Sequence, residues 1–175
     1  MVEWWTWSFW ADGMLGSLHF GCALLALLLG PVILLRRKGG AWHRWAGRVF
    51  VASMLILNTN ALFMYDMSGR PNLFHLFAVV SLVTLLSALW GIYRFKRTRS
   101  RHHLVLHQHC MVWAYFGLLM AGLWQVTFQL MRFEVITLSP GAFFNALGLF
   151  TAVAGGATMM TLKRLYPPPP KAKTA

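Results

Sequence analysis

Five apolar runs, each about long enough to cross a lipid bilayer, constrain this 175-residue chain more than any other feature. A membrane-spanning helix needs about 20 apolar residues, and backbone groups inside lipid must be paired within their own segment. Each run is therefore predicted to be a helix, and the short links predict antiparallel neighbours. The runs cover residues 15–35, 45–65, 73–93, 110–131 and 142–162.

The composition leads to the same fold class. Hydrophobic residues make up 58% of the chain and charged residues only 11%, whereas about a quarter of the residues in a soluble domain are charged. Most of the apolar surface must therefore face lipid. We expect an all-α integral membrane protein, an up-down bundle of five transmembrane helices in which helices one to four form the core.

The two ends of the chain are predicted to lie outside this transmembrane domain of residues 15–162. Residues 1–14 lack the basic start of a secretory signal and are rich in tryptophan, which is typical of a membrane interface. Residues 163–175 contain four consecutive prolines, which cannot continue a helix. This end is predicted to be a disordered tail. The tryptophans of the first segment are Trp4, Trp5, Trp7 and Trp10.

The charges predict the orientation of the chain. Fourteen of the 16 basic residues follow the first, third and fifth runs, while all four acidic residues fall on the other side. The positive-inside rule then places the N-terminus outside and the C-terminus in the cytoplasm of a bacterial cell, with the protein in the cytoplasmic membrane. The net charge of +12 is mainly a topology signal, with membrane lipids rather than nucleic acid as the expected partner.

One histidine lies on or beside each of the first four predicted helices. His19 and His75 fall near the outer ends, and His43 and His107 near the inner ends. In an up-down bundle, helices one and three are parallel and can lie diagonally, as can helices two and four. Two facing imidazoles are what bis-histidine haem ligation requires. We therefore predict two b-type haems, ligated by His19 with His75 and by His43 with His107.

Small residues beside these histidines have two interpretations, which the sequence leaves open. They give space for a flat macrocycle, or they let membrane helices pack closely. A histidine at a helix end can also simply bind headgroups or loop carbonyls. The small residues and their neighbours are Gly16, Ala23, Ala26 and Gly30 near His19, Gly47 near His43, and Met111, Ala114, Gly117 and Ala121 near His107.

The stretch RSRHHLVLHQHCMVWAY, residues 99–115, holds four histidines. His102 and His103 are interpreted as solvated loop residues before the fourth helix. His109 lies about 200° around a helix from His107, so both cannot face one site, and His109 is kept as a fallback ligand. Cys22 and Cys110 fall near opposite membrane faces and are expected not to form a disulfide.

Four stretches together resemble a known family. They are HFGC at 19–22, RRKGGAWHRWAGR at 36–48, FHLFA at 74–78 and HQHCMVWAY at 107–115. The chain is similar over residues 15–131 to the bacterial membrane family called domain of unknown function 2306, and HRWAG is the most specific part. The family's spacing of histidine, methionine and tyrosine falls on His107, Met111 and Tyr115, which favours His107 over His109. The resemblance implies a multi-helix membrane protein but no activity.

The architecture also resembles the ascorbate-linked dihaem cytochromes b, which have paired histidines in two layers. That likeness implies the same two histidine pairs, but this chain lacks a clear substrate-binding signature and is of different length. The first hypothesis for function is transmembrane electron transfer through two haems, to a quinone or another small redox partner. If the protein is an enzyme, it is then a membrane oxidoreductase of cytochrome b type.

Two further hypotheses do not involve haem. Ten methionines and seven histidines could serve a protein that handles copper or a small solute, although the methionines are scattered. Alternatively the chain is an assembly subunit with no site of its own. A hydrolase is not favoured, because there is no paired-carboxylate site, no phosphate-binding glycine loop and no His-Glu-x-x-His motif. The oligomeric state does not follow from the sequence.

Overall fold

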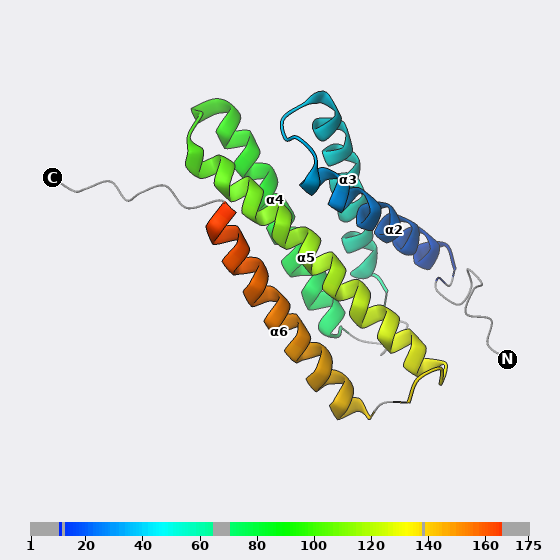
Figure 1. Cartoon of the computed structure of the whole chain (residues 1–175). Coiled ribbons are helices and arrows are strands. Elements are labelled where there is room, and N and C mark those ends of the chain that lie inside the picture. Colours follow the sequence, from blue (N-terminus) through cyan, green and yellow to red (C-terminus); the bar gives the residue numbers. More distant parts are fainter. Residues whose placement is uncertain (1–10, 12, 65–70, 138, 166–175) are drawn as a thin grey trace. The chain divides into compact units, whose positions relative to one another are not determined.

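The computed structural model describes residue 11 and residues 13–64, 71–137 and 139–165, which form five α-helices and no strand (Figure 1). The predicted all-α fold is confirmed. The four N-terminal tryptophans and the proline-rich tail after residue 165 lie outside the described residues. The helices are α2 (Gly13–Leu35), α3 (Ala41–Ala61), α4 (Leu73–Thr98), α5 (Arg101–Arg132) and α6 (Pro140–Leu165).

Four of these helices, α2, α4, α5 and α6, are long and apolar enough to cross a membrane. Helix α3 is not among them. Its first half carries Arg44 and Arg48, and its last turns carry Asn58 and Asn60, so it is less apolar than the others. That α3 crosses the membrane as well stays a prediction.

The turn that joins α2 to α3 differs from the turn that joins α4 to α5. Between α2 and α3 the chain reverses at Gly39, whose φ of +85° is a conformation that glycine adopts without strain. Gly40 is the N-cap of α3, and its carbonyl oxygen accepts the first hydrogen bond of the helix from the backbone N–H of Arg44. Between α4 and α5 only Arg99 and Ser100 intervene, and Arg99 has a φ of 54°. The backbone N–H of Arg99 donates to the carbonyl of Phe95, which closes α4.

Helix α5 is longer than the sequence predicts. It begins at Arg101 rather than at residue 110, so the loop interpretation of His102 and His103 is wrong: both lie in the first turn of α5. The physical reason is that the apolar length marks only the part of a helix that lies in lipid. Basic and histidine residues continue the helix beyond it, because no proline or glycine interrupts them.

The chain divides into two compact units. The first is Met1–Leu82 with Gly117–Thr137. In this unit α2 packs against α3, and Ala26, Phe50 and Met54 are almost fully buried. The beginning of α4 and the end of α5 meet edge to face through the rings of Phe77 and Trp124, with centroids 6.2 Å apart.

The second unit is Val83–Phe116 with Leu138–Ala175. Here α4 and α5 approach so closely that a Cβ placed on Gly91 would lie 2.9 Å from the backbone oxygen of His103 and the backbone nitrogen of His107. Leu85 and Ala88 of α4 are fully buried beside this contact. Helix α6 contributes Gly155, where a Cβ would meet the rings of Phe116 and Trp113 of α5.

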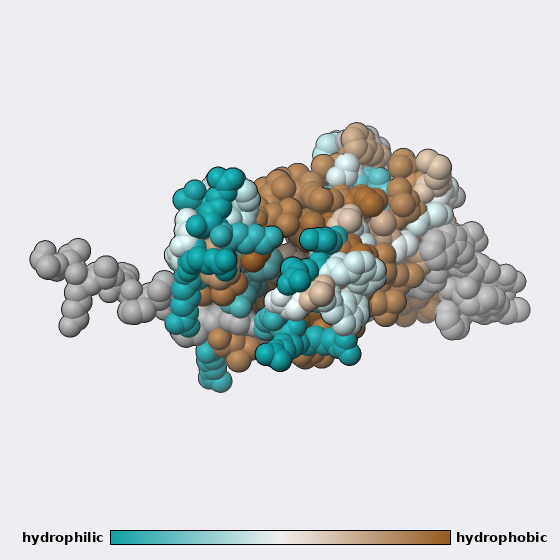
Figure 2. Space-filling view, turned by 90° about the horizontal axis from the view of Figure 1, so that it is seen from above, coloured by the Kyte–Doolittle hydropathy of each residue, from teal (hydrophilic) through white to brown (hydrophobic). Residues whose placement is uncertain are grey.

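Large apolar side chains remain exposed on the helices. Leu28 is 72% exposed, Leu149 68% and Val153 64%. Figure 2 shows broad brown apolar areas, with the teal hydrophilic side chains gathered in separate patches. A protein in water rarely exposes so much contiguous apolar surface, whereas lipid solvates it well.

Candidate functional site

His19 lies on α2 and reaches across to α3. Its Nδ1 is 3.0 Å from the backbone carbonyl oxygen of Leu57, and the side chain is partly buried. A carbonyl can only accept, so the imidazole donates through Nδ1–H. The lone pair of the neutral ring is then on Nε2.

His107 makes the same kind of contact in the second unit. Its Nδ1, on α5, is 2.9 Å from the carbonyl oxygen of Ala88 on α4. The close approach of α5 to Gly91, one turn along from Ala88, brings this carbonyl within reach. His107 therefore also donates through Nδ1–H and carries its lone pair on Nε2.

His75 lies in the first turn of α4 and is only 8% exposed. Its Nδ1 is 3.1 Å from Oδ1 of Asn72 and 3.2 Å from the backbone nitrogen of Asn72. The same Asn72 oxygen accepts a bond from the backbone N–H of Phe74, so it caps the start of α4. The ring of His75 is thus held by the capping residue of its own helix.

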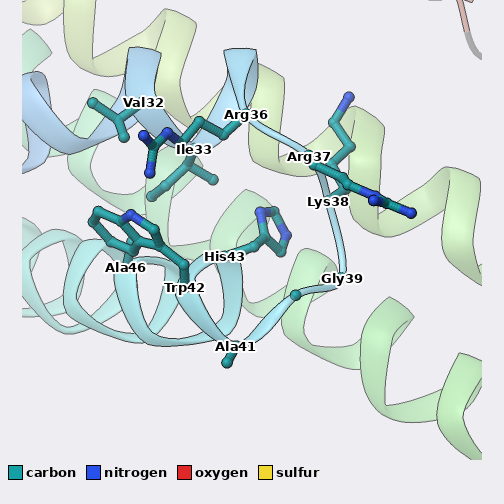
Figure 3. A pocket seen from close by; sticks show the side chains of 11 residues that line it. Val32, Ile33, Arg36, Arg37, Lys38, Gly39, Ala41, Trp42, His43 and Ala46 are labelled. Atoms are coloured by element: carbon teal, nitrogen blue, oxygen red, sulfur yellow. The ribbon is translucent and has the colours of Figure 1, made fainter.

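His43 lies in the first turn of α3 and lines a cavity of about 700 Å³ beside the α2–α3 turn. Figure 3 shows its ring projecting from α3 toward α2. Among the described residues, no hydrogen-bond partner reaches its buried Nδ1. Burial lowers the pKa of His43 below its ordinary value, and the charge of Lys38 lowers it further. The neutral ring, which is the form that ligates iron, is therefore favoured.

The four predicted ligands divide between the units, with His19, His43 and His75 in the first and His107 in the second. His19 and His75 form hydrogen bonds with different residues, Leu57 and Asn72. Their pairing across an iron stays a prediction. So does the pairing of His43 with His107. Within the described residues there is no group of three or more histidine, cysteine or acidic side chains that could hold a metal ion by themselves. A bis-histidine haem needs only two protein ligands, because the macrocycle supplies the others.

The other candidate residues are placed as follows. His102 is exposed and its ring meets that of His103 at 5.6 Å between centroids. The fallback ligand His109 is partly buried on α5. Cys22 on α2 and Cys110 on α5 are both free thiols.

The structure separates the two interpretations of the small residues. Gly16, Ala26 and Gly30 on α2 are buried, which is the packing interpretation. Gly47 and Gly117 differ, because a Cβ on either would meet nothing within 4 Å. Gly47 is half-buried, so space remains one turn beyond His43 on α3, whereas Gly117 is exposed and its open side is the outer surface of α5.

A family model described as predicted membrane protein (DUF2306) matches residues 16–162 of the chain. The chain belongs to this family. No curated protein and no solved structure matches it. The DUF2306 match covers all four predicted ligand histidines. It extends beyond residue 131, where the resemblance seen in the sequence ends, to residue 162 in α6. The more distant likeness to dihaem cytochromes b stays a prediction.

The sequence indicates the four histidines, but it does not indicate the carbonyl groups that orient His19 and His107. The acceptors for His19 and His107 are backbone carbonyls, of Leu57 and Ala88, and any residue type supplies a carbonyl. The only signal available was Gly91, since a glycine three residues from Ala88 on a membrane helix is typical of a close helix contact.

Proposed function

We propose that this DUF2306 protein binds two b-type haems and transfers electrons across the bacterial cytoplasmic membrane. His19 and His75 would ligate the outer haem, and His43 and His107 the inner one. The excess of basic residues on one side supports an outside N-terminus and a cytoplasmic C-terminus. A quinone or another small redox molecule would be the partner.

The observation that carries the proposal is the shared contact of His19 and His107. Each imidazole donates Nδ1–H to a backbone carbonyl of the neighbouring helix. Histidines that ligate a metal almost always donate their other ring N–H to a carbonyl or carboxylate, which fixes the tautomer and the ring plane.

The helices would contribute three things to haem binding. The carbonyls of Leu57 and Ala88 hold two imidazoles so that Nε2 can ligate iron. The space beside Gly47, where a Cβ would meet nothing within 4 Å, leaves room for part of a flat ring. The apolar surroundings exclude water from the path, while the bound haem supplies one-electron chemistry. The exposed apolar surface places the whole assembly in membrane lipid.

The test is the absorption spectrum of the purified full-length protein. We expect sharp reduced-minus-oxidised bands of b-type haem and two haems per chain. His19→Ala and His107→Ala should each lower the haem-to-protein ratio by about half, because each removes one ligand of one pair. His102→Ala is the matched control: it removes an exposed histidine of α5 and should leave the ratio unchanged.

A protein without these bands after expression with sufficient haem would refute the proposal. Equal haem content in His19→Ala, His107→Ala and the control would do so too. If His107→Ala retains haem but His109→Ala loses it, the inner ligand is the fallback residue, and the choice between these two histidines is corrected.

A further inference from the structure

The cavity at the α2–α3 turn combines positive charge with an apolar wall (Figure 3). Three consecutive basic residues, Arg36, Arg37 and Lys38, line it together with the apolar Val32 and Ile33. The sequence contains no acidic residue between Asp12 and Asp66. The segment that carries this turn therefore contributes positive charge and no negative charge of its own.

Arg36 is exposed to solvent and also contacts an aromatic ring at the cavity. Its guanidinium carbon lies 5.8 Å from the centroid of the Trp42 ring, a cation–π contact between the end of α2 and the first turn of α3. In Figure 3 the side chain of Arg36 turns back along α2 toward Trp42. Stacking on an aromatic ring leaves the edge N–H groups of a guanidinium available for an anion.

The backbone of the turn adds to the positive potential. Gly40 is the N-cap of α3 and has no side chain to bond the first N–H groups of the helix. These groups lack partners within a helix and carry the positive end of its dipole. The turn itself is fixed, because Nη1 of Arg44 donates to the carbonyl oxygen of Gly39 at 2.6 Å.

We propose that this cavity binds the phosphate group of an anionic membrane lipid, whose acyl chains suit the apolar wall. The phosphate would contact the guanidinium of Arg36 and the start of α3. The acyl chains would continue along exposed apolar residues of α2, such as Val32 and Leu28. This site goes beyond the proposed electron transfer. His43, a proposed ligand of the inner haem, lines the same cavity, but the contacts proposed for the phosphate do not involve His43.

The experiment titrates the full-length protein in detergent with three probes and measures binding by native mass spectrometry or calorimetry. The probes are phosphatidylglycerol, diacylglycerol with the same acyl chains, and inorganic phosphate. We expect phosphatidylglycerol to bind more tightly than diacylglycerol, which lacks the phosphate. Arg36→Gln should weaken this binding about fivefold, the factor that one basic residue near the membrane surface contributes.

Two further variants make the result specific. Arg36→Lys keeps the charge but loses the planar fork, so its affinity should fall between those of the wild type and Arg36→Gln. Arg164→Gln is the matched control, because it removes one exposed arginine from the last turn of α6. It should leave the binding of phosphatidylglycerol unchanged. Thermal unfolding of each variant verifies that it is folded.

The outcomes separate the two sources of phosphate. Preference for phosphatidylglycerol that depends on Arg36 identifies a lipid site. Binding of inorganic phosphate that depends on Arg36, without preference for the lipid, identifies a site for free phosphate. If Arg36→Gln and Arg164→Gln affect all three probes alike, general charge attraction accounts for the binding and the proposal is wrong. Neither arginine is a proposed haem ligand, so haem content reports on electron transfer separately.

Discussion

The α2–α3 pair and the α4–α5 pair of the second unit share one contact but differ in their spacing near the turn. In each, an imidazole Nδ1–H donates to a carbonyl of the neighbouring helix. At the α2–α3 turn the helices leave a cavity of about 700 Å³. Near the α4–α5 turn they close until Gly91 touches the backbone of α5. A five-residue turn with two glycines permits the first arrangement, and a two-residue turn with a glycine in the facing helix produces the second.

The position of a glycine determines how closely the two helices of each pair approach near their turn. Glycine within α4 removes a side chain and lets two backbones meet, which fixes the pair. Gly39 in the α2–α3 turn adopts a positive φ, and the helix ends stay apart, with a cavity between them. The histidine contacts are compatible with both spacings, because they lie where each pair is close enough for a side chain to reach a carbonyl.

The largest expected effect comes from filling the close contact in the second unit. Gly91→Ala would place a methyl group 2.9 Å from two backbone atoms of α5, which cannot move as a flexible side chain can. We expect a loss of about 1–3 kcal/mol in the free energy of unfolding, measured by denaturant titration in detergent. Gly117→Ala is the control, since its methyl group would meet nothing within 4 Å. Equal stability of the two variants would contradict the described packing.

The next effect tests the turn between α2 and α3. Gly39→Ala introduces a side chain at a φ of +85°, which costs about 1–2 kcal/mol in the left-handed region. Gly40→Ala is the matched control, because Gly40 has a φ of −70° and open space around it. It should cost less, about 0.5–1 kcal/mol, because Gly40 is the N-cap of α3 and alanine is poorer than glycine at that position. A Gly40→Ala variant less stable than Gly39→Ala would mean that the turn has another conformation.

The smallest effect compares the two histidine contacts directly. His19→Phe and His107→Phe each keep a ring of similar size but lose one bond between helices. We expect each to lower the free energy of unfolding by about 0.5–1.5 kcal/mol, since single side-chain bonds between membrane helices contribute modestly. His102→Phe, at an exposed position, should change it less. If only one of the two variants has a lower free energy of unfolding, the two histidine contacts do not contribute equally to stability.

The fold could be predicted from the sequence because its cause is compositional. Five long apolar runs can satisfy their backbones in lipid only as helices, and five helices are present in the described residues. The positions of His19, His43, His75 and His107 on or beside four helices were also predictable, since a histidine within an apolar run is visible in any one sequence.

What could not be predicted depends on the backbone and on turn geometry. The extent of α5 was missed because apolarity measures the part of a helix in lipid and says little about where hydrogen bonding stops. The bonds of His19 and His107 were missed because a carbonyl acceptor has no signature in the identity of its residue. The cavity beside His43 depends on how Gly39 turns the chain, and the motif RRKGG indicates a turn without indicating the space behind it.

The length of α5 has a consequence for what stands outside the membrane. Its 32 residues form a rod of about 48 Å, whereas the hydrocarbon layer is about 30 Å thick. When α5 lies along the bilayer normal, roughly a third of its length projects beyond the layer or lies within the headgroups, and a tilt of the helix shortens this part. The first turns of α5, which carry Arg101, His102 and His103, would then be an ordered helix outside the hydrocarbon layer. A molecule that binds there would meet a surface with a defined shape.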